Sequence, residues 1–179
     1  MIDLTTKSLP NTVSVGGKDF SINTDFRLWM RFEIEVGKMG RGDYIDVAYL
    51  FKDEHPAYIS IPDLFQFSRP QSELPRPISH SDVIAYDYEL DSDLIFAAFW
   101  GQYGIDLTTI EDLHWHKFLA LFKGLNESTR MREVMQYRCY EKSSNKEKDI
   151  YEELRRAWEI ERKSPEEQAE IEKFSSYFD

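Results

Sequence analysis

Two patterns of apolar and polar residues follow one another along the chain. Near the N-terminus apolar residues alternate with polar ones on both sides of Gly16-Gly17, and this pattern predicts a short β-hairpin. From residue 26 onward apolar residues recur every three to four positions, which is typical of amphipathic helices. An isolated hairpin is only marginally stable, so we expect it to pack against these helices. The pattern therefore predicts a mainly α protein, a compact helical domain with a short N-terminal β-hairpin.

Capping residues indicate where the individual helices begin. Asn23-Thr24-Asp25 precedes a predicted helix over 26–36, and Asp91-Ser92-Asp93 precedes an almost uniformly apolar helix that reaches Trp100. Thr108 and Glu111 form a capping box for a helix whose apolar stripe is Ile110, His114, Phe118, Leu121 and Leu125. Shorter helices are expected over 43–51, 61–67 and 128–137, and three prolines predict an extended surface loop over 69–77.

The chain changes in character after residue 142. A polar link leads to a helix with a narrow apolar stripe, formed by Ile150, Leu154, Ala157 and Trp158. A further capping box at Ser164 then precedes a final helix with Ile171, Phe174 and Phe178 on one side. Two such amphipathic helices with densely charged flanks either dock on the domain or lie in a partner's groove, self-association being one form of the second alternative. We therefore divide the chain into a helical domain, 1–142, and a charged helical extension, 143–179.

The charge of the chain narrows the classes of partner. A net charge of −11 argues against binding to nucleic acid or to an anionic membrane surface, which both require clusters of Lys and Arg. The alternatives are a basic partner or a charge that only keeps the protein soluble. The longest apolar run, 94–100, is too short to span a bilayer, and the N-terminus lacks the features of a signal peptide. The single cysteine, Cys139, is expected at the edge of the core and fits a reducing cytoplasm.

Alternating acids before the apolar helix invite comparison with a calcium-binding loop. An EF-hand loop that began at Asp87 would need Gly at its sixth position and Glu at its twelfth, but these positions hold Ser92 and Ala98. We expect the acids to serve as a helix start, where carboxylates interact well with the helix dipole.

No catalytic or metal-binding motif is present. His114 and His116 are two positions apart, about 200° of rotation on a helix, so they would face apart and could not chelate one ion. We expect His114 to be a hydrogen-bonded core residue and His116 to lie on the polar side. No zinc motif, Walker A loop, dinucleotide fingerprint or nucleophile elbow occurs, so we expect no enzyme, metal or cofactor.

The aromatic residues are the remaining candidates for function. Core packing is one interpretation, and the other is that some form a docking surface, because Trp and Tyr are enriched among interface hot spots. The candidate partner-binding residues are Trp100, Tyr103, Trp115, Trp158, Phe174 and Phe178.

Several short motifs together resemble the bacteriophage Gp15 family, over residues 13–140. The matching elements are Asn23-Thr24-Asp25-Phe26-Arg27, Trp29, Phe32, Tyr86-Asp87-Tyr88, Asp91-Ser92-Asp93, Ile95, Ala97-Ala98-Phe99, Gln102-Tyr103-Gly104, Ile105-Asp106-Leu107, Leu113-His114-Trp115, Phe118, Leu121, Leu125 and Tyr137-Arg138.

The resemblance implies a protein of the tail module of long-tailed phages, with no catalytic residues to transfer. Such proteins are similar in gene placement to tail assembly chaperones, which act transiently in the host bacterial cytoplasm. The expected partners are the tape-measure protein and, in addition, the tail-tube protein. The alternatives are a structural protein retained in the tail and an enzyme with an unrecognised acidic site.

Overall fold

A computed structural model describes residues 2–6, 8–40, 42–70, 83–141 and 150–160. Within these ranges the protein is mainly α, as predicted, with six α-helices, one 3-10 helix and one two-stranded sheet. The elements are β1 (Thr12–Val15), β2 (Lys18–Ser21), α1 (Phe26–Lys38), η1 (Ala48–Leu50), α2 (Ile61–Ser68), α3 (Ser92–Tyr103), α4 (Trp115–Lys123), α5 (Arg130–Arg138) and α6 (Ile150–Trp158).

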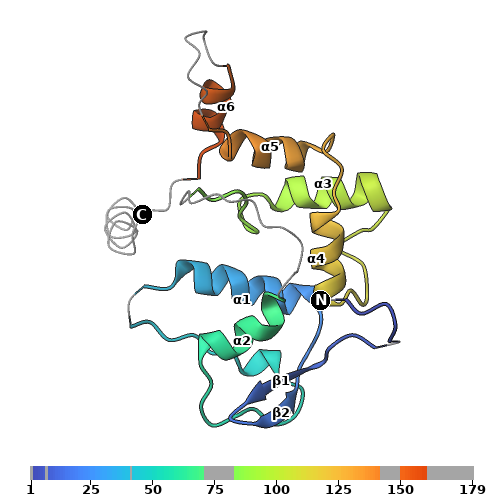
Figure 1. Ribbon diagram of the computed structural model, residues 1–179, viewed down its shortest axis with the longest axis vertical. Coiled ribbons are helices and arrows are strands. Elements are labelled where there is room, and N and C mark those ends of the chain that lie inside the picture. The colour runs from blue at the N-terminus through green and yellow to red at the C-terminus, as the bar shows by residue number, and fades with distance from the viewer. Residues whose placement is uncertain (1, 7, 41, 71–82, 142–149, 161–179) are drawn as a thin grey trace, which may run out of the picture.

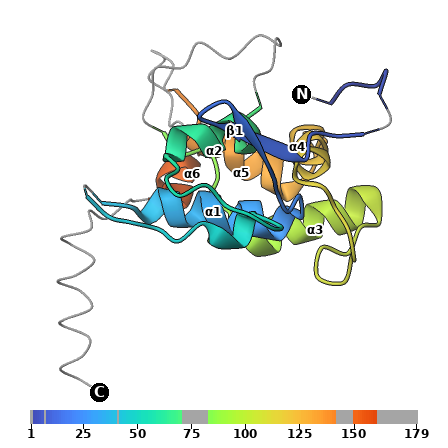
Figure 2. The same cartoon turned by 90° about the horizontal axis from the view of Figure 1, so that it is seen from below.

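Helix α4 joins two halves of the molecule (Figure 1). The N-terminal half consists of the hairpin, α1, η1 and α2, and the C-terminal half consists of α3, α5 and α6. Helix α4 contacts α1 in the first half and α3 in the second. Strand β1 contacts α2, and the view from below also shows these two elements side by side (Figure 2).

The predicted hairpin is confirmed. Strands β1 and β2 are antiparallel, with Val13 opposite Phe20, and Gly16 and Gly17 both have positive φ, 59° and 81°. Two successive left-handed residues form the turn whose twist matches that of the strands, and glycine adopts this conformation without steric cost.

The start of α1 is also confirmed. Asp25 is the N-cap, and its carboxylate accepts a hydrogen bond from the backbone N–H of Arg27 at 2.8 Å. The buried face of α1 carries Phe26, Trp29 and Phe32, and the Trp29 indole donates to the carbonyl of Asn23. The cap fixes where the helix begins, and the spacing of its aromatic residues determines which face is buried.

Phe118 on α4 is the centre of the core. Its ring is fully buried and stacks on four others, Phe26 of α1, Phe99 of α3 and Trp115 and Phe122 of α4, with centroids 5.2, 5.1, 5.5 and 6.0 Å away. These contacts join both halves of the molecule through a single side chain.

Two helix boundaries differ from the prediction, and an aspartate side chain is involved each time. Over 43–51 only the 3-10 helix η1 forms, because Asp46 accepts the N–H of Ala48 in a local turn. Asp106 likewise accepts the N–H and the hydroxyl of Thr108. Thr108 is therefore not an N-cap, and α4 begins only at Trp115.

One of the two predicted C-terminal helices is described. Helix α6 packs against α5, and the Arg130 guanidinium lies 5.3 Å from the centre of the Trp158 ring. Residues 150–158 therefore dock on their own chain. The predicted proline-rich loop lies mostly outside the described residues, and the polar link and the helix with Phe174 and Phe178 lie outside them altogether. Cys139 is exposed.

Candidate functional site: the outer face of α3

A buried ion pair holds the N-terminal end of α3. Asp91 precedes the helix, but its carboxylate binds the Arg138 guanidinium of α5 through contacts of 2.6 and 2.9 Å. The two side chains are 3% and 5% exposed. The backbone N–H of Asp87 also donates to Asp91. Asp91 is the N-cap residue of α3, as predicted, but its carboxylate makes no hydrogen bond to a helix N–H and pairs with Arg138 instead.

Arg138 also contacts two further segments. Its Nε donates to the carbonyl of Trp158 at 2.7 Å, and its Nη1 also contacts the carbonyl of Ala85 at 3.3 Å. One guanidinium thus joins the end of α6 and the segment before α3 to α5. Sequence analysis missed this role because the ion-pair partner lies 47 residues away, although Tyr137-Arg138 was among the motif residues.

One face of α3 remains uncovered by the described residues, and we call it the outer face. It consists of Phe96, Ala97, Trp100 and Gly101, which recur at helical spacing. Trp100 is 55% exposed, and its ring stacks on Phe96 with the planes 12° apart. A Cβ built on Gly101 would meet nothing within 4 Å. The inner face packs on α4 and α5 through Ile95, Ala98 and Phe99.

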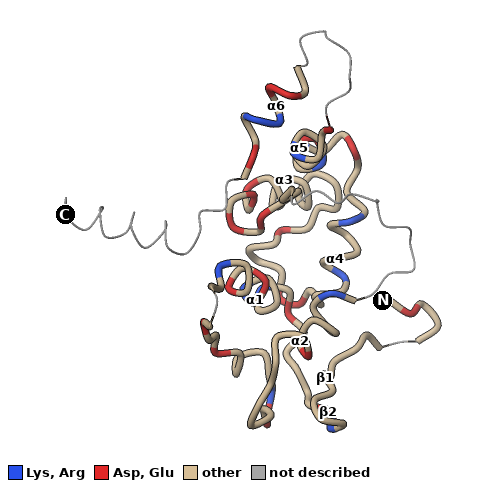
Figure 3. Tube along the Cα trace, turned by 60° about the vertical axis from the view of Figure 1, so that its left-hand side comes forward, with Lys and Arg blue, Asp and Glu red and all other residues tan. Residues whose placement is uncertain are grey.

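The chain segment that contains α3 is acidic and has no cation of its own, although the Arg27 guanidinium of α1 reaches its loop at the carbonyls of Leu107 and Ile110. Residues 83–114 contain seven carboxylates and neither Lys nor Arg, and the tube over them is tan and red (Figure 3). Arg138 neutralises Asp91, and Lys38 pairs with Glu89 at 2.6 Å. The remaining carboxylates form an acidic margin: Asp87, Asp93, Asp106, Glu111 and Asp112.

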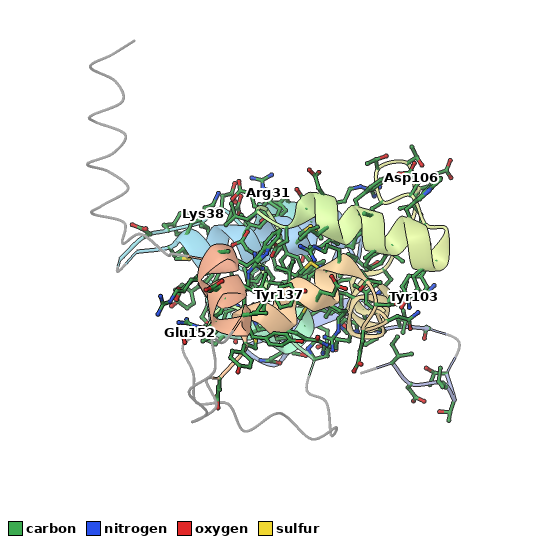
Figure 4. All side chains as sticks on the ribbon, turned by 90° about the horizontal axis from the view of Figure 1, so that it is seen from above. Arg31, Lys38, Tyr103, Asp106, Tyr137 and Glu152 are labelled. Atoms are coloured by element: carbon green, nitrogen blue, oxygen red, sulfur yellow. The ribbon has the colours of Figure 1, made fainter. Side chains whose placement is uncertain are left out.

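Tyr103, the last residue of α3, and Asp106, in the loop that follows, lie on different sides of the helix (Figure 4). Asp106 lies on the loop beyond α3, on the outer side, whereas Tyr103 lies on the side of α4 (Figure 4). The Tyr103 hydroxyl donates to the carbonyl of Leu121 at 2.9 Å. Tyr103 therefore joins α3 to α4 rather than extending the outer face.

Trp115 does not belong to the candidate surface. It is 1% exposed, and its indole N–H donates to the carbonyl of Ser68 at 2.8 Å. The interpretation of Trp115 as a partner-facing residue is corrected by this burial, because it could reach a partner only if the core opened. Trp158 is partly buried against α5, so Trp100 is the exposed tryptophan among the described candidates.

The prediction that His116 lies on the polar side is wrong, because it is buried, whereas His114 is hydrogen-bonded as predicted but only partly buried. His114 is the N-cap of α4, where its Nδ1 accepts the N–H of His116 and its Nε2 donates to the carbonyl of Pro10. His116 is 5% exposed and donates through Nε2 to the carbonyl of Phe67 at 2.8 Å. Desolvation by burial lowers the pKa of both imidazoles, that of His116 to about 4. Their ring centroids are 5.2 Å apart, so they do not point in opposite directions as predicted.

The described residues offer neither a metal-binding cluster nor a membrane-spanning helix. Among the described residues no group of three or more His, Cys, Asp or Glu side chains could hold a metal ion. None of the helices in the described ranges is both long and apolar enough to cross a membrane.

A family model described as "Bacteriophage Gp15 protein" matches residues 47–160, well over half of the chain. The chain belongs to the bacteriophage Gp15 family. It is therefore a phage protein of the structural or tail-related kind. The matched region contains all of α3 and the acidic margin, and it continues through α6. It begins later and ends later than the expected span of 13–140. No curated protein and no solved structure matches the chain.

Proposed function

We propose that this Gp15 protein is a non-enzymatic tail assembly chaperone that binds the phage tape-measure protein during tail assembly in the host cytoplasm. The observation that carries the proposal is the uncovered aromatic face of α3 in a chain of this family. A tape-measure protein is long and helical, and its apolar stripes need cover until the tail tube encloses them. The tail-tube protein is a second proposed partner.

The chemistry of the outer face suits an amphipathic helix. Phe96 and Trp100 form an aromatic ridge, while Ala97 and Gly101 leave room for a second backbone to approach. Stacked aromatic anchors of this kind are frequent among interface hot spots. Carboxylates around an apolar centre favour a partner helix whose apolar stripe is flanked by Lys or Arg.

Co-expression with the cognate tape-measure protein tests the proposal. We expect a co-purifying complex and a larger soluble fraction of the tape-measure protein than in its absence. Trp100→Ala should weaken the complex by roughly 30-fold or more, as truncation of a hot-spot residue does. Tyr151→Ala on α6 is the matched control, because Tyr151 is 56% exposed and Trp100 is 55% exposed. If no complex forms, the chaperone proposal is wrong; if both variants weaken the complex equally, α3 is not the specific site.

A structural protein retained in the tail is the second candidate, and family membership alone supports it equally. Mass spectrometry of purified virions separates the two functions. A chaperone should be absent from mature particles, whereas a tail component should be present in a fixed ratio to the tail-tube protein.

A further inference from the structure

A recess lies in the N-terminal half, away from α3. It has a volume of about 430 Å³ and lies between the end of α1, η1 and the start of α2 (Figure 1). Its walls are largely apolar and include Met39, Val47, Phe51, Ile59 and Leu64. This volume is in the range of sites that hold a small ligand or a single large side chain.

Two tyrosines line the recess and remain open to solvent. Tyr44 is 87% exposed and Tyr58 is 80% exposed. Tyrosine provides a large contact area at a low cost in conformational entropy, and its ring face attracts cations. Both properties suit a recess that binds a side chain from another molecule.

The recess has an acidic side, formed by two aspartates. Asp43 and Asp46 line the recess, and neither Lys, Arg nor Glu does so among the described residues. The backbone N–H of Gly40 donates to Asp43 at 2.6 Å, and that of Ala48 donates to Asp46 at 3.0 Å. These bonds hold both carboxylates in place before any cation arrives.

We infer that this recess binds a lysine or arginine side chain of a partner protein, with the aliphatic stem along the apolar wall and the cationic head at Asp43 and Asp46. The charge complementarity selects a cation, and the apolar wall selects one that carries an aliphatic stem. The inference is independent of the proposed chaperone function, because the outer face of α3 takes no part in it.

Small probes test this chemistry directly. In an NMR titration, N-acetyl-lysine methylamide and N-acetyl-arginine methylamide should shift the amide signals of Gly40 and Ala48 in a saturable way. The norleucine analogue, which has a similar stem without charge, should bind at least fivefold more weakly. The glutamate analogue should cause no saturable shift.

Substitutions then locate the site. The double substitution Asp43→Asn with Asp46→Asn removes both charges but keeps an acceptor for each backbone N–H, and it should weaken lysine binding at least fivefold. The control is Asp53→Asn with Glu54→Gln, which removes two charges nearby that do not line the recess and should leave binding unchanged. Tyr58→Ser removes an aromatic ring from the wall of the recess, and it should also weaken lysine binding. Equal binding of the norleucine analogue, equal losses in the control pair or shifts that never saturate would each overturn the inference.

Discussion

Helices α3 and α4 are consecutive along the chain and both rich in aromatic residues, yet α3 leaves an aromatic side chain exposed whereas α4 buries all of its aromatic side chains. Helix α4 buries Trp115, His116, Phe118, Leu119 and Phe122. Helix α3 buries three side chains and leaves Trp100 exposed. The difference lies in position, because α4 runs between the two halves of the molecule (Figure 1), whereas α3 lies at one edge of the molecule in the view from below (Figure 2). An aromatic residue thus becomes core or surface according to the elements around its helix.

The largest contrast should appear between the two tryptophans. Trp115→Ala should destabilise the protein by about 3–5 kcal/mol, because it leaves a cavity in the core. Trp100→Ala should change the free energy of unfolding by less than about 0.5 kcal/mol, as is usual at exposed positions. Chemical denaturation measures both values. A loss at Trp100 as large as that at Trp115 would show that the outer face is covered in the free protein.

The ion pair that anchors α3 should also have a large effect. Arg138→Ala leaves the buried carboxylate of Asp91 without its cation, and breaking such a pair typically costs about 3–5 kcal/mol. The double substitution Asp91→Asn with Arg138→Met should be less destabilising than Arg138→Ala alone, because no buried charge is left uncompensated. A larger loss in the double variant would contradict this account of the end of α3.

The burial of His116 in α4 predicts a dependence of stability on pH. Its folded pKa, about 4, lies below the ordinary value of 6.5, so the unfolded chain binds the proton first. Stability is therefore complete above about pH 6.5 and is lost as the pH falls towards 4, with a slope of at most about 1.4 kcal/mol per pH unit for one proton. Unfolding curves between pH 5 and about 7 should become flatter in His116→Gln, which keeps a donor for Phe67. An unchanged slope would place the titrating group elsewhere.

Glycine substitutions give the smallest expected effect and distinguish open from crowded surface. Gly101→Ala on the outer face should stabilise the protein by up to about 1 kcal/mol, because Ala is the better helix former and the new methyl group meets nothing within 4 Å. Gly124→Ala should give no such gain, since its Cβ would lie 3.2 Å from the carbonyl of Ala120 and 3.3 Å from the Tyr103 hydroxyl. Thermal unfolding of both variants compares the sites, and equal gains would contradict the difference in crowding.

Local signals predicted much of the fold and less of the candidate site. The glycine pair of the hairpin, the Asp25 cap and the three-to-four spacing act within a few residues, and the structure confirms the elements that they mark. The predictions failed where an aspartate side chain formed its own turn, at Asp46 and Asp106. They also missed the ion pair of Asp91, because its partner Arg138 comes from another helix. Sequence spacing could not separate Trp100 from Trp115, since that difference depends on which elements pack around each helix.

The acidic margin of α3 also bears on how copies of this protein behave toward one another. An aromatic ridge on the surface would ordinarily promote self-association, but two identical faces would bring like charges together around the contact. Repulsion of this kind is weakened by salt and disappears when carboxylates are protonated. We expect a monomer at neutral pH and low salt, and reversible association at high salt that Trp100→Ala abolishes, as sedimentation velocity would show. The carboxylates that we propose attract a basic partner would thus also keep the protein monomeric before it binds that partner.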